Sequence, residues 1–288
     1  MAHLFCFGYG MSAQALARIL KAEGWRISGT SRDADKIAAM AATGVTGHLW
    51  HAGAPLDPAI LGDVTHILVS IKPDDAGDPV VRALESIGDR LPRFRWIGYL
   101  STTGVYGDRG GDIVTEDTPP APTSDRGRRR LAAEDAWRRL AAARDLPLHI
   151  FRLPGIYGPG RNPLEKILSG TARQVMQPGQ VFCRIHVEDL AQALRASIDR
   201  PDPGRIYNIC DDEPAPPDEV LRHAAMLLGL PPPPEVAPDD PEVSPMRRSF
   251  YAENKRVSNA RMKAELKVAL VYPTYREGLA AILEGLRP

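Results

Sequence analysis

Cysteine is scarce in this sequence, and the cysteines that occur are widely spaced. Cys6, Cys183 and Cys210 form no CxxC pair and no Cys/His spacing, so they predict neither a disulfide framework nor a zinc site. No other group of His, Asp or Cys has the spacing of metal ligands, and no metal is expected. We expect the three thiols to be small buried side chains in strands.

An excess of charge is also absent, because 36 basic residues balance 36 acidic ones. This balance gives no electrostatic reason to expect nucleic acid or an anionic membrane as a partner. No apolar run approaches the ~18 residues of a membrane-spanning helix, and no signal segment is recognisable, so we expect a cytoplasmic protein. The dense basic run Arg126–Arg130 is more typical of a solvated first helical turn than of a phosphate patch.

The sequence does contain an alternation of strand and helix patterns. Short apolar runs predict strands, and apolar residues at helical spacing predict helices between them. The predicted strands are 3–7, 25–30, 45–49, 65–70, 96–101, 149–153 and 206–210, and the predicted helices are 12–23, 33–42, 80–91, 131–143, 189–199 and 218–228. Residues 112–126 are expected to form a surface loop. This alternation predicts an α/β protein whose parallel sheet binds ligands at the carboxyl ends of its strands.

A change of composition after Asp211 predicts a second, smaller region, because prolines become frequent there. The run Pro231–Pro234 is more typical of a stiff connector than of a partner-binding polyproline segment. We predict a Rossmann-type doubly wound parallel sheet formed by residues 1–160 and completed by 186–212. A smaller α+β substrate region would comprise residues 161–185 and 213–288.

The loop from Gly8 to Ala13 joins the first predicted strand to the first predicted helix and follows the pattern GxGxxA. The first glycine permits the sharp turn, the second lets the backbone approach a pyrophosphate, and the alanine permits close helix packing. A plain tight turn is the alternative, but the strand and helix on either side favour a nicotinamide cofactor site. The predicted cofactor-binding residues here are Gly8, Tyr9, Gly10, Met11, Ser12 and, at another strand end, Ser70.

The end of the second predicted strand lacks the carboxylate that NAD-selective sites use for the ribose. Ser31 followed by Arg32 suits the phosphate of NADP, since a guanidinium forms a charge-assisted fork with phosphate. We predict NADP as the cofactor, with NAD as the alternative that Asp33 keeps open. An exposed loop arginine is the other interpretation of Arg32.

Several motifs together resemble the extended short-chain dehydrogenase/reductases, the NAD-dependent epimerase/dehydratase group. These motifs are Gly8–Ala13, Ser101–Gly107, Leu131–Glu134, Phe151–Arg161 and Arg184–Ala191. Two C-terminal segments, Asn254–Asn259 and Tyr272–Leu279, are similar to an atypical YeeZ-like branch of that family.

The resemblance implies a Ser or Thr that binds the substrate oxygen, and a YxxxK motif in which the tyrosine transfers a proton. Thr102 matches the first position, and Arg130 falls where the lysine belongs. Arg126 falls where the tyrosine belongs, so the family's catalytic tyrosine is missing. An arginine stays protonated and cannot act as a general base, although Arg130 can donate to the cofactor ribose or hold an anionic substrate group.

Tyr106 and Tyr157 could supply a displaced phenol, although a structural role is the more common one for such aromatic residues. His186 invites interpretation as a proton relay, but the resemblance places it where a strand leads into a helix, with Asp189 as a cap or helix-start acid. The resemblance implies that Arg161 and Arg184 border the substrate cleft.

The leading hypothesis is an NADP-dependent oxidoreductase or epimerase-like enzyme that acts on a carbonyl or nucleotide-sugar-like small molecule. The alternative is a cofactor-binding sensor or regulatory protein that lacks turnover, consistent with the missing tyrosine. A methyltransferase that uses the glycine loop for S-adenosylmethionine conflicts with the later motifs. The resemblance also implies a homodimer.

Overall fold

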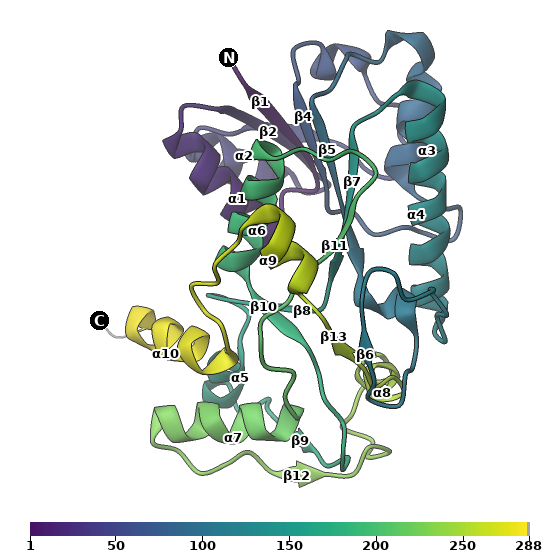
Figure 1. Ribbon diagram of the computed structural model, residues 1–288. Coiled ribbons are helices and arrows are strands. Elements are labelled where there is room, and N and C mark those ends of the chain that lie inside the picture. Colours follow the sequence, from purple (N-terminus) through teal and green to yellow (C-terminus); the bar gives the residue numbers. More distant parts are fainter. Residues whose placement is uncertain (287–288) are drawn as a thin grey trace. The chain divides into compact units, whose positions relative to one another are not determined.

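The computed structural model describes residues 1–286, which divide into two compact units (Figure 1). The first unit comprises Met1–Thr102, Arg128–Arg152 and Ala191–Tyr207, and the remaining segments form the second. The sequence-based boundaries differ, because they assign 103–127, 153–160, 186–190 and 208–212 to the Rossmann domain. Three of these four segments begin where a strand of the large sheet ends and the chain leaves that sheet.

The first unit contains a seven-stranded parallel sheet with the strand order β11-β7-β5-β4-β1-β2-β3. Its strands are β1 His3–Phe7, β2 Arg26–Ser31, β3 Thr46–Leu49, β4 His66–Val69, β5 Trp96–Thr102, β7 Leu148–Leu153 and β11 Ile206–Asn208. The chain moves from β1 to β2 and β3 on one side and returns to β4 on the other side, so a topological switch point lies between β1 and β4. The predicted doubly wound sheet is confirmed.

Helices cover both faces of this sheet (Figure 1). On one face lie α1 Met11–Ala22, α2 Ala34–Ala42 and α6 Val187–Asp199, and on the other lie α3 Pro79–Ile87 and α4 Asp125–Arg144. The large core beneath α3 and α4 includes Phe5, Leu84 and Trp137. On the opposite face the indole of Trp96 donates a hydrogen bond to Oγ of Ser197 at 3.0 Å. Short 3-10 helices occur at Pro58–Leu61, Gly88–Arg90 and Thr103–Tyr106.

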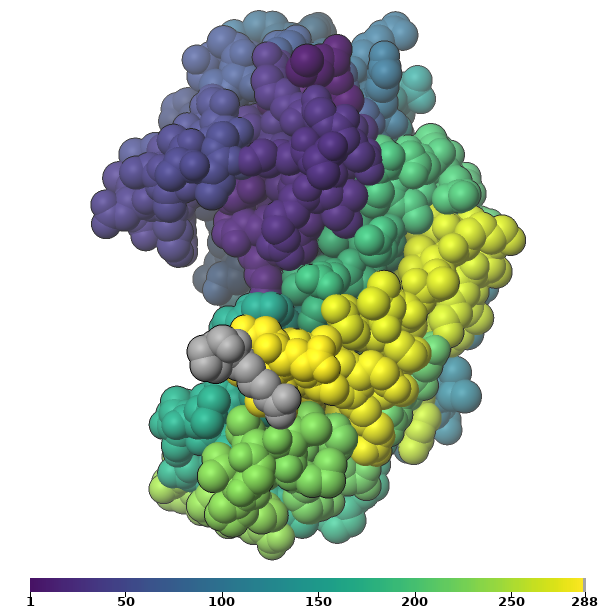
Figure 2. Space-filling model, turned by 90° about the vertical axis from the view of Figure 1, so that its left-hand side faces the viewer, coloured from purple at the N-terminus to yellow at the C-terminus, as the bar shows by residue number. Residues whose placement is uncertain are grey.

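The second unit combines paired short strands with helices. Its parallel pairs are β8 Gly155–Tyr157 with β10 Arg184–His186, β9 Gln174–Val175 with β12 Glu235–Val236, and β6 Ile113–Val114 with β13 Arg256–Val257. Its helices are α5 Pro163–Leu168, α7 Pro217–Leu228, α8 Pro245–Tyr251, α9 Ala260–Leu266 and α10 Tyr275–Leu286. Helices α5, α7 and α10 share a core that includes Tyr157 and Tyr275, and α7 and α10 present their outer sides on the surface shown in Figure 2.

Two expectations about local structure need correction. Helix α4 begins at Asp125, six residues before the predicted start, and the predicted loop 112–126 contains β6. The basic run at the start of α4 has too few apolar residues to show a helical period, and a two-residue strand shows no period either. The cysteines are buried as expected, but Cys183 precedes β10 and Cys210 follows β11 instead of lying within a strand.

Asp189 lies in the first turn of α6 and does not cap it. Its carboxylate accepts hydrogen bonds from the backbone amides of Val271 and Tyr272 at 2.7 and 2.9 Å. No helix among the described residues is long and apolar enough to cross a membrane.

Candidate functional site

The glycine loop follows β1 at the switch point of the sheet. Gly8 has φ +86°, and a Cβ there would lie 2.8 Å from Oγ of Ser70, so this position requires glycine. The amide of Gly8 donates to Oγ1 of Thr30 at 2.9 Å, and the amide of Tyr9 donates to the Thr30 carbonyl at 3.1 Å. These bonds tie the turn to β2 and fix its path.

Gly10 differs from Gly8 because nothing within the protein requires a glycine there. Its φ of −93° suits any residue, and an added Cβ would meet no atom within 4 Å. Gly10 is the N-cap residue of α1 and offers no side-chain hydrogen bond to the first-turn amides of Met11, Ser12 and Ala13. Free amides at a helix N-terminus beside open space fit a pyrophosphate group.

Ser70 holds the glycine loop from the neighbouring strand. Its hydroxyl lies 2.8 Å from the carbonyl of Gly8 and 3.3 Å from that of Phe7, and it can donate to either. Ser70 was predicted as a cofactor-binding residue, and this contact shows how it positions the loop. Gly29 also supports the loop, because a Cβ there would lie 3.0 Å from the Cys6 carbonyl and 3.3 Å from the Tyr9 ring.

The end of β2 presents one exposed cation. Within residues 1–286 the guanidinium of Arg32 has no hydrogen bond and no ion pair. Oγ of Ser31 accepts from the amide of Asp33 at 3.2 Å. The carboxylate of Asp33 caps α2 by accepting from the amides of Asp35 and Lys36, so an oxygen of this acid is occupied by the helix.

Arg130 lies on α4 against the carboxyl end of β5. Its Nη1 donates to the hydroxyl of Tyr99 at 3.0 Å and to the carbonyl of Leu100 at 2.9 Å. Thr102 is the last residue of β5 and is half-buried. The first unit therefore brings the glycine loop, Ser31, Arg32, Ser70 and Thr102 to the same edge of one sheet, at the ends of β1, β2, β4 and β5.

A buried ion-pair network beneath Thr102 was not anticipated from the sequence. Glu134 accepts from Nε and Nη2 of Arg152 at 3.1 and 2.8 Å, and from the hydroxyl of Ser101 at 2.5 Å. Both charged side chains are almost completely shielded from solvent. The network fixes the end of β5 against α4, and Arg138 adds a further contact to Glu134. The signal available in the sequence was a charged residue within each of two motifs, Glu134 in the helix motif and Arg152 in the strand motif.

Arg126, which the sequence motif aligns with the tyrosine of the YxxxK pattern, belongs to the second unit. The guanidinium of Arg126 lies over the ring of Phe250, 4.1 Å from its centroid. Tyr106 is fully buried, and its hydroxyl donates to Oδ1 of Asn208 at 2.8 Å. The phenol of Tyr106 is therefore already occupied by a structural hydrogen bond.

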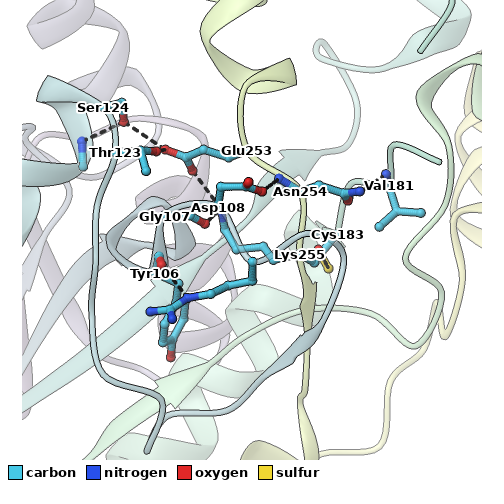
Figure 3. Close-up of polar contacts among 12 residues, drawn as sticks. Tyr106, Gly107, Asp108, Thr123, Ser124, Val181, Cys183, Glu253, Asn254 and Lys255 are labelled. Carbon is cyan, nitrogen blue, oxygen red and sulfur yellow. Dashed lines mark hydrogen bonds and ion pairs between the residues drawn. The ribbon is translucent and has the colours of Figure 1, made fainter. Parts of the chain in front are cut away.

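The segment after Tyr106 is held by a buried ion pair (Figure 3). Nζ of Lys255 donates to the carbonyl of Gly107 and to Oε2 of Glu253, both at 2.7 Å. Oε1 of Glu253 accepts from the hydroxyls of Thr123 and Ser124 at 3.0 and 3.2 Å. The ion pair thus joins two parts of the loop that connects β5 to α4: Lys255 binds Gly107, and Glu253 binds Thr123 and Ser124.

Two predicted substrate residues differ in their surroundings. Arg161 is exposed, and its side chain has no partner among the residues the structure describes. Nη2 of Arg184 donates to the carbonyl of Ala215 at 3.3 Å, and its guanidinium lies 5.4 Å from the centre of the Tyr275 ring.

His186 is buried between aromatic rings. Its ring centre lies 5.2 Å from that of Tyr157 and 4.1 Å from that of Tyr272, and its Nδ1 accepts from the amide of Glu188. Burial lowers the pKa of His186, so the ring is neutral near neutral pH. These contacts favour the structural interpretation over a proton relay.

Comparison with known proteins agrees with this geometry. Residues 80–210 match the NAD dependent epimerase/dehydratase family. Protein YeeZ of Escherichia coli strain K12 is 31% identical over 241 residues, which cover 78% of this chain and 84% of YeeZ.

Two solved structures show the same fold. A functionally unknown conserved protein from Silicibacter pomeroyi DSS is 52% identical, with a TM-score of 0.90 and full coverage of both chains. UDP-glucuronic acid 4-epimerase from Bacillus cereus in complex with NAD is 15% identical, with a TM-score of 0.78 over 99% of this chain and 98% of that one. From the similarity to YeeZ over most of both chains, together with the family match, this chain belongs to the NAD-dependent epimerase/dehydratase family.

Proposed function

We propose that this protein is an NADP-dependent oxidoreductase or epimerase-like enzyme that acts on a small carbonyl or nucleotide-sugar-like substrate. The observation that carries the proposal is the contrast between the two glycines of the loop. The turn requires a glycine at Gly8 because of its positive φ. Gly10, in contrast, has open space beside it and is followed by the uncapped amides of α1. An anion bound beside Gly10 would explain both the open space next to this residue and the lack of a side-chain cap on the first amides of α1.

The preference for NADP rests on the end of β2. Among residues 1–286 no side chain or carbonyl pairs with the guanidinium of Arg32, and Asp33 uses its carboxylate to cap α2. A phosphate on the adenosine ribose would receive the guanidinium fork of Arg32 and the hydroxyl of Ser31. A bare ribose would leave Arg32 without a partner.

The bound cofactor supplies hydride chemistry between its nicotinamide and a carbonyl or carbinol carbon. Thr102 donates a hydrogen bond to the substrate oxygen, and Arg130 directs its remaining N–H groups toward the ribose. Tyr99 and Leu100 keep the guanidinium of Arg130 in place. Arg161 and Arg184 bind negatively charged groups of the substrate.

The proton donor differs from that of the family, because Arg126 occupies the tyrosine position. A guanidinium held over Phe250 can bind an anion but does not release a proton near neutral pH. Tyr106 was the sequence-based candidate, and using it would require breaking its hydrogen bond to Asn208.

The second candidate function is a cofactor-binding sensor without turnover. Arg126 and Tyr106 favour it, since neither side chain is available for proton transfer. The protein would then bind the dinucleotide at the same loop and respond to its reduction.

The experiment that separates the two functions is a turnover assay with NADP⁺ and NADPH and a panel of nucleotide sugars and small carbonyl compounds. The enzyme proposal expects a substrate-dependent change in cofactor absorbance or an epimerised product. The Thr102→Val variant, which removes the hydroxyl at nearly constant shape, should bind the cofactor normally and lose turnover. Cofactor binding with no turnover across the panel would favour the sensor.

A further inference from the structure

Three polar side chains in the core of the second unit have unused hydrogen-bonding atoms. Among the described residues, Nη1 of Arg184, both carboxylate oxygens of Asp211 and the hydroxyl of Tyr275 are shielded from solvent and have no hydrogen-bond partner. Asp211 is 2% exposed and Tyr275 is 1% exposed. Buried polar groups are nearly always hydrogen-bonded, so unpartnered atoms gathered in one place indicate that something else binds there.

These side chains are neighbours in the fold. The amide of Asp211 donates to the carbonyl of Arg184 at 2.8 Å, which places the two residues on adjoining segments. The guanidinium of Arg184 lies 5.4 Å from the centre of the Tyr275 ring. The amide of Asp212 donates to the carbonyl of Pro273 at 2.8 Å, which brings the start of α10 to the same place.

Arg184 and Asp211 do not pair directly, although each influences the charge of the other. The unused Nη1 and the unused carboxylate oxygens are shielded from solvent, so a bridging group reaches them only when these side chains move apart. Such a group has to accept hydrogen bonds from Arg184 and Tyr275. An oxyanion, which offers several acceptor lone pairs and one or two negative charges, meets this requirement.

We propose that Arg184, Tyr275 and Asp211 form a site for one oxyanion group, a carboxylate or a phosphate, and that Asp211 must carry a proton for the anion to bind. The inference rests on the substrate role proposed for Arg184 and deepens it. With Asp211 neutral, the site has the single positive charge of Arg184 and three side chains that can donate hydrogen bonds to the anion. With Asp211 ionised, its carboxylate serves as the counterion of Arg184 and repels the ligand.

The surroundings of Asp211 favour its neutral form. Burial raises the pKa of Asp211 to about 8, although the guanidinium of Arg184 opposes this shift. The backbone amide of Glu213 also opposes the shift of this pKa, whereas the neighbouring carboxylates of Asp212 and Glu213 act in the same direction as burial. The other titratable groups near the pocket are Tyr157 on β8, Asp189 on α6, and the thiols of Cys183 and Cys210. The affinity for the anion is therefore highest well below pH 8 and falls as the pH rises through about 8.

The test measures the binding of radiolabelled sulfate by equilibrium dialysis at pH 6.5 and 9.5 and at constant ionic strength. Sulfate stays a dianion at both pH values, so only the protein titrates. For the unaltered protein we expect one sulfate per chain and an affinity about thirtyfold lower at pH 9.5, since each pH unit above the pKa costs about a factor of ten. The Asp211→Asn variant, which keeps the shape and cannot ionise, should bind equally at both pH values.

The neighbouring acid provides the matched control. Asp212 is exposed and bonded to Asn259 and Lys263, so the Asp212→Asn variant should retain the pH dependence of the unaltered protein. Arg184→Gln should lose sulfate binding at both pH values. The inference is overturned if the unaltered protein binds no sulfate, binds it equally at both pH values, or if Asp211→Asn keeps the fall at pH 9.5.

Failure of this inference and failure of the proposed function can be told apart. Sulfate binding reports on the second unit, whereas NADPH binding reports on the glycine loop of the first. Sulfate binding that depends on Asp211 without NADPH binding would support the oxyanion site and contradict the proposed function. NADPH binding and turnover without sulfate binding would support the proposed function and contradict the oxyanion site.

Discussion

Nη1 of Arg130 donates to the hydroxyl of Tyr99 at 3.0 Å, and this contact fixes a cation beside the carboxyl end of β5. Tyr99 is fully buried and packs against Trp137, with 5.7 Å between the ring centres, so its hydroxyl is a rigid acceptor. The guanidinium therefore has a defined position instead of the mobility of an exposed arginine. The arrangement suits a residue that contacts the cofactor.

The Tyr99→Phe variant should weaken NADPH binding about fivefold, because the loss of one hydrogen bond of roughly 1 kcal/mol frees Arg130. Fluorescence titration would measure this change, with Arg129→Ala as the control, since the exposed Asp75 is the charged partner of Arg129 within residues 1–286. In an Arg130→Ala background the Tyr99→Phe change should have no further effect. Independent effects of the two substitutions would contradict the positioning role of Tyr99.

The two glycines of the loop should respond differently to alanine. Gly8→Ala should lower the free energy of unfolding by at least about 1–2 kcal/mol, because φ +86° is unfavourable for alanine and Ser70 is in the way. Gly10→Ala should leave stability nearly unchanged and weaken dinucleotide binding about tenfold or more, because the added methyl group keeps the pyrophosphate too far from the backbone amides for a charge-assisted hydrogen bond. Thermal unfolding and cofactor titration of both variants check this contrast. Equal cofactor affinity of the unaltered protein and Gly10→Ala would speak against a pyrophosphate at this loop.

The buried pair of Glu134 and Arg152 should dominate the stability of the first unit. Glu134→Gln leaves Arg152 as a buried charge without its counterion and should cost about 3–5 kcal/mol of unfolding free energy. Asp135→Asn is the matched control, because Asp135 is exposed and forms only a surface pair with Arg138, for which we expect about 0.5 kcal/mol. Denaturant unfolding measures both variants. Similar losses for the two would show that the buried pair contributes no more than the surface pair.

The end of β2 should decide between the two cofactors. Arg32→Ala should weaken NADPH binding about tenfold, the equivalent of roughly 1.4 kcal/mol, and leave NADH binding unchanged. Lys36→Ala, which removes a nearby exposed cation on α2, should change neither affinity. If Arg32→Ala weakens NADH and NADPH equally, the assignment of Arg32 to the ribose phosphate is incorrect.

The order of strands and helices in the first unit could be predicted because each element carries a local pattern. The run 3–7 became β1, and the predicted helix 33–42 became α2, with Asp33 as its N-cap residue. The start of α4 could not be predicted, since its first turns consist of arginines that make their contacts through tertiary structure. Arg130 reaches Tyr99 across 31 positions of the sequence.

The candidate site shows the same limit. The glycine loop and Arg32 follow from local motifs, whereas the partners of Glu134 and the unpaired state of Asp211 depend on segments far apart in the chain. Asp211 stands in a short acidic run in which Asp212 is exposed and Glu213 is half-buried, and nothing in the sequence of that run distinguishes the buried carboxylate. The division into units also depends on where the chain packs after leaving the sheet, which no local pattern encodes.

The most direct test of the account is a titration of the unaltered protein with NADPH and with NADH, followed by the same titration of Gly10→Ala. We predict that both dinucleotides bind, that NADPH binds more tightly, and that Gly10→Ala weakens both without loss of folding. Absence of binding to either dinucleotide in the folded, unaltered protein would contradict the central claim that the loop from Gly8 to Ala13 receives a cofactor pyrophosphate.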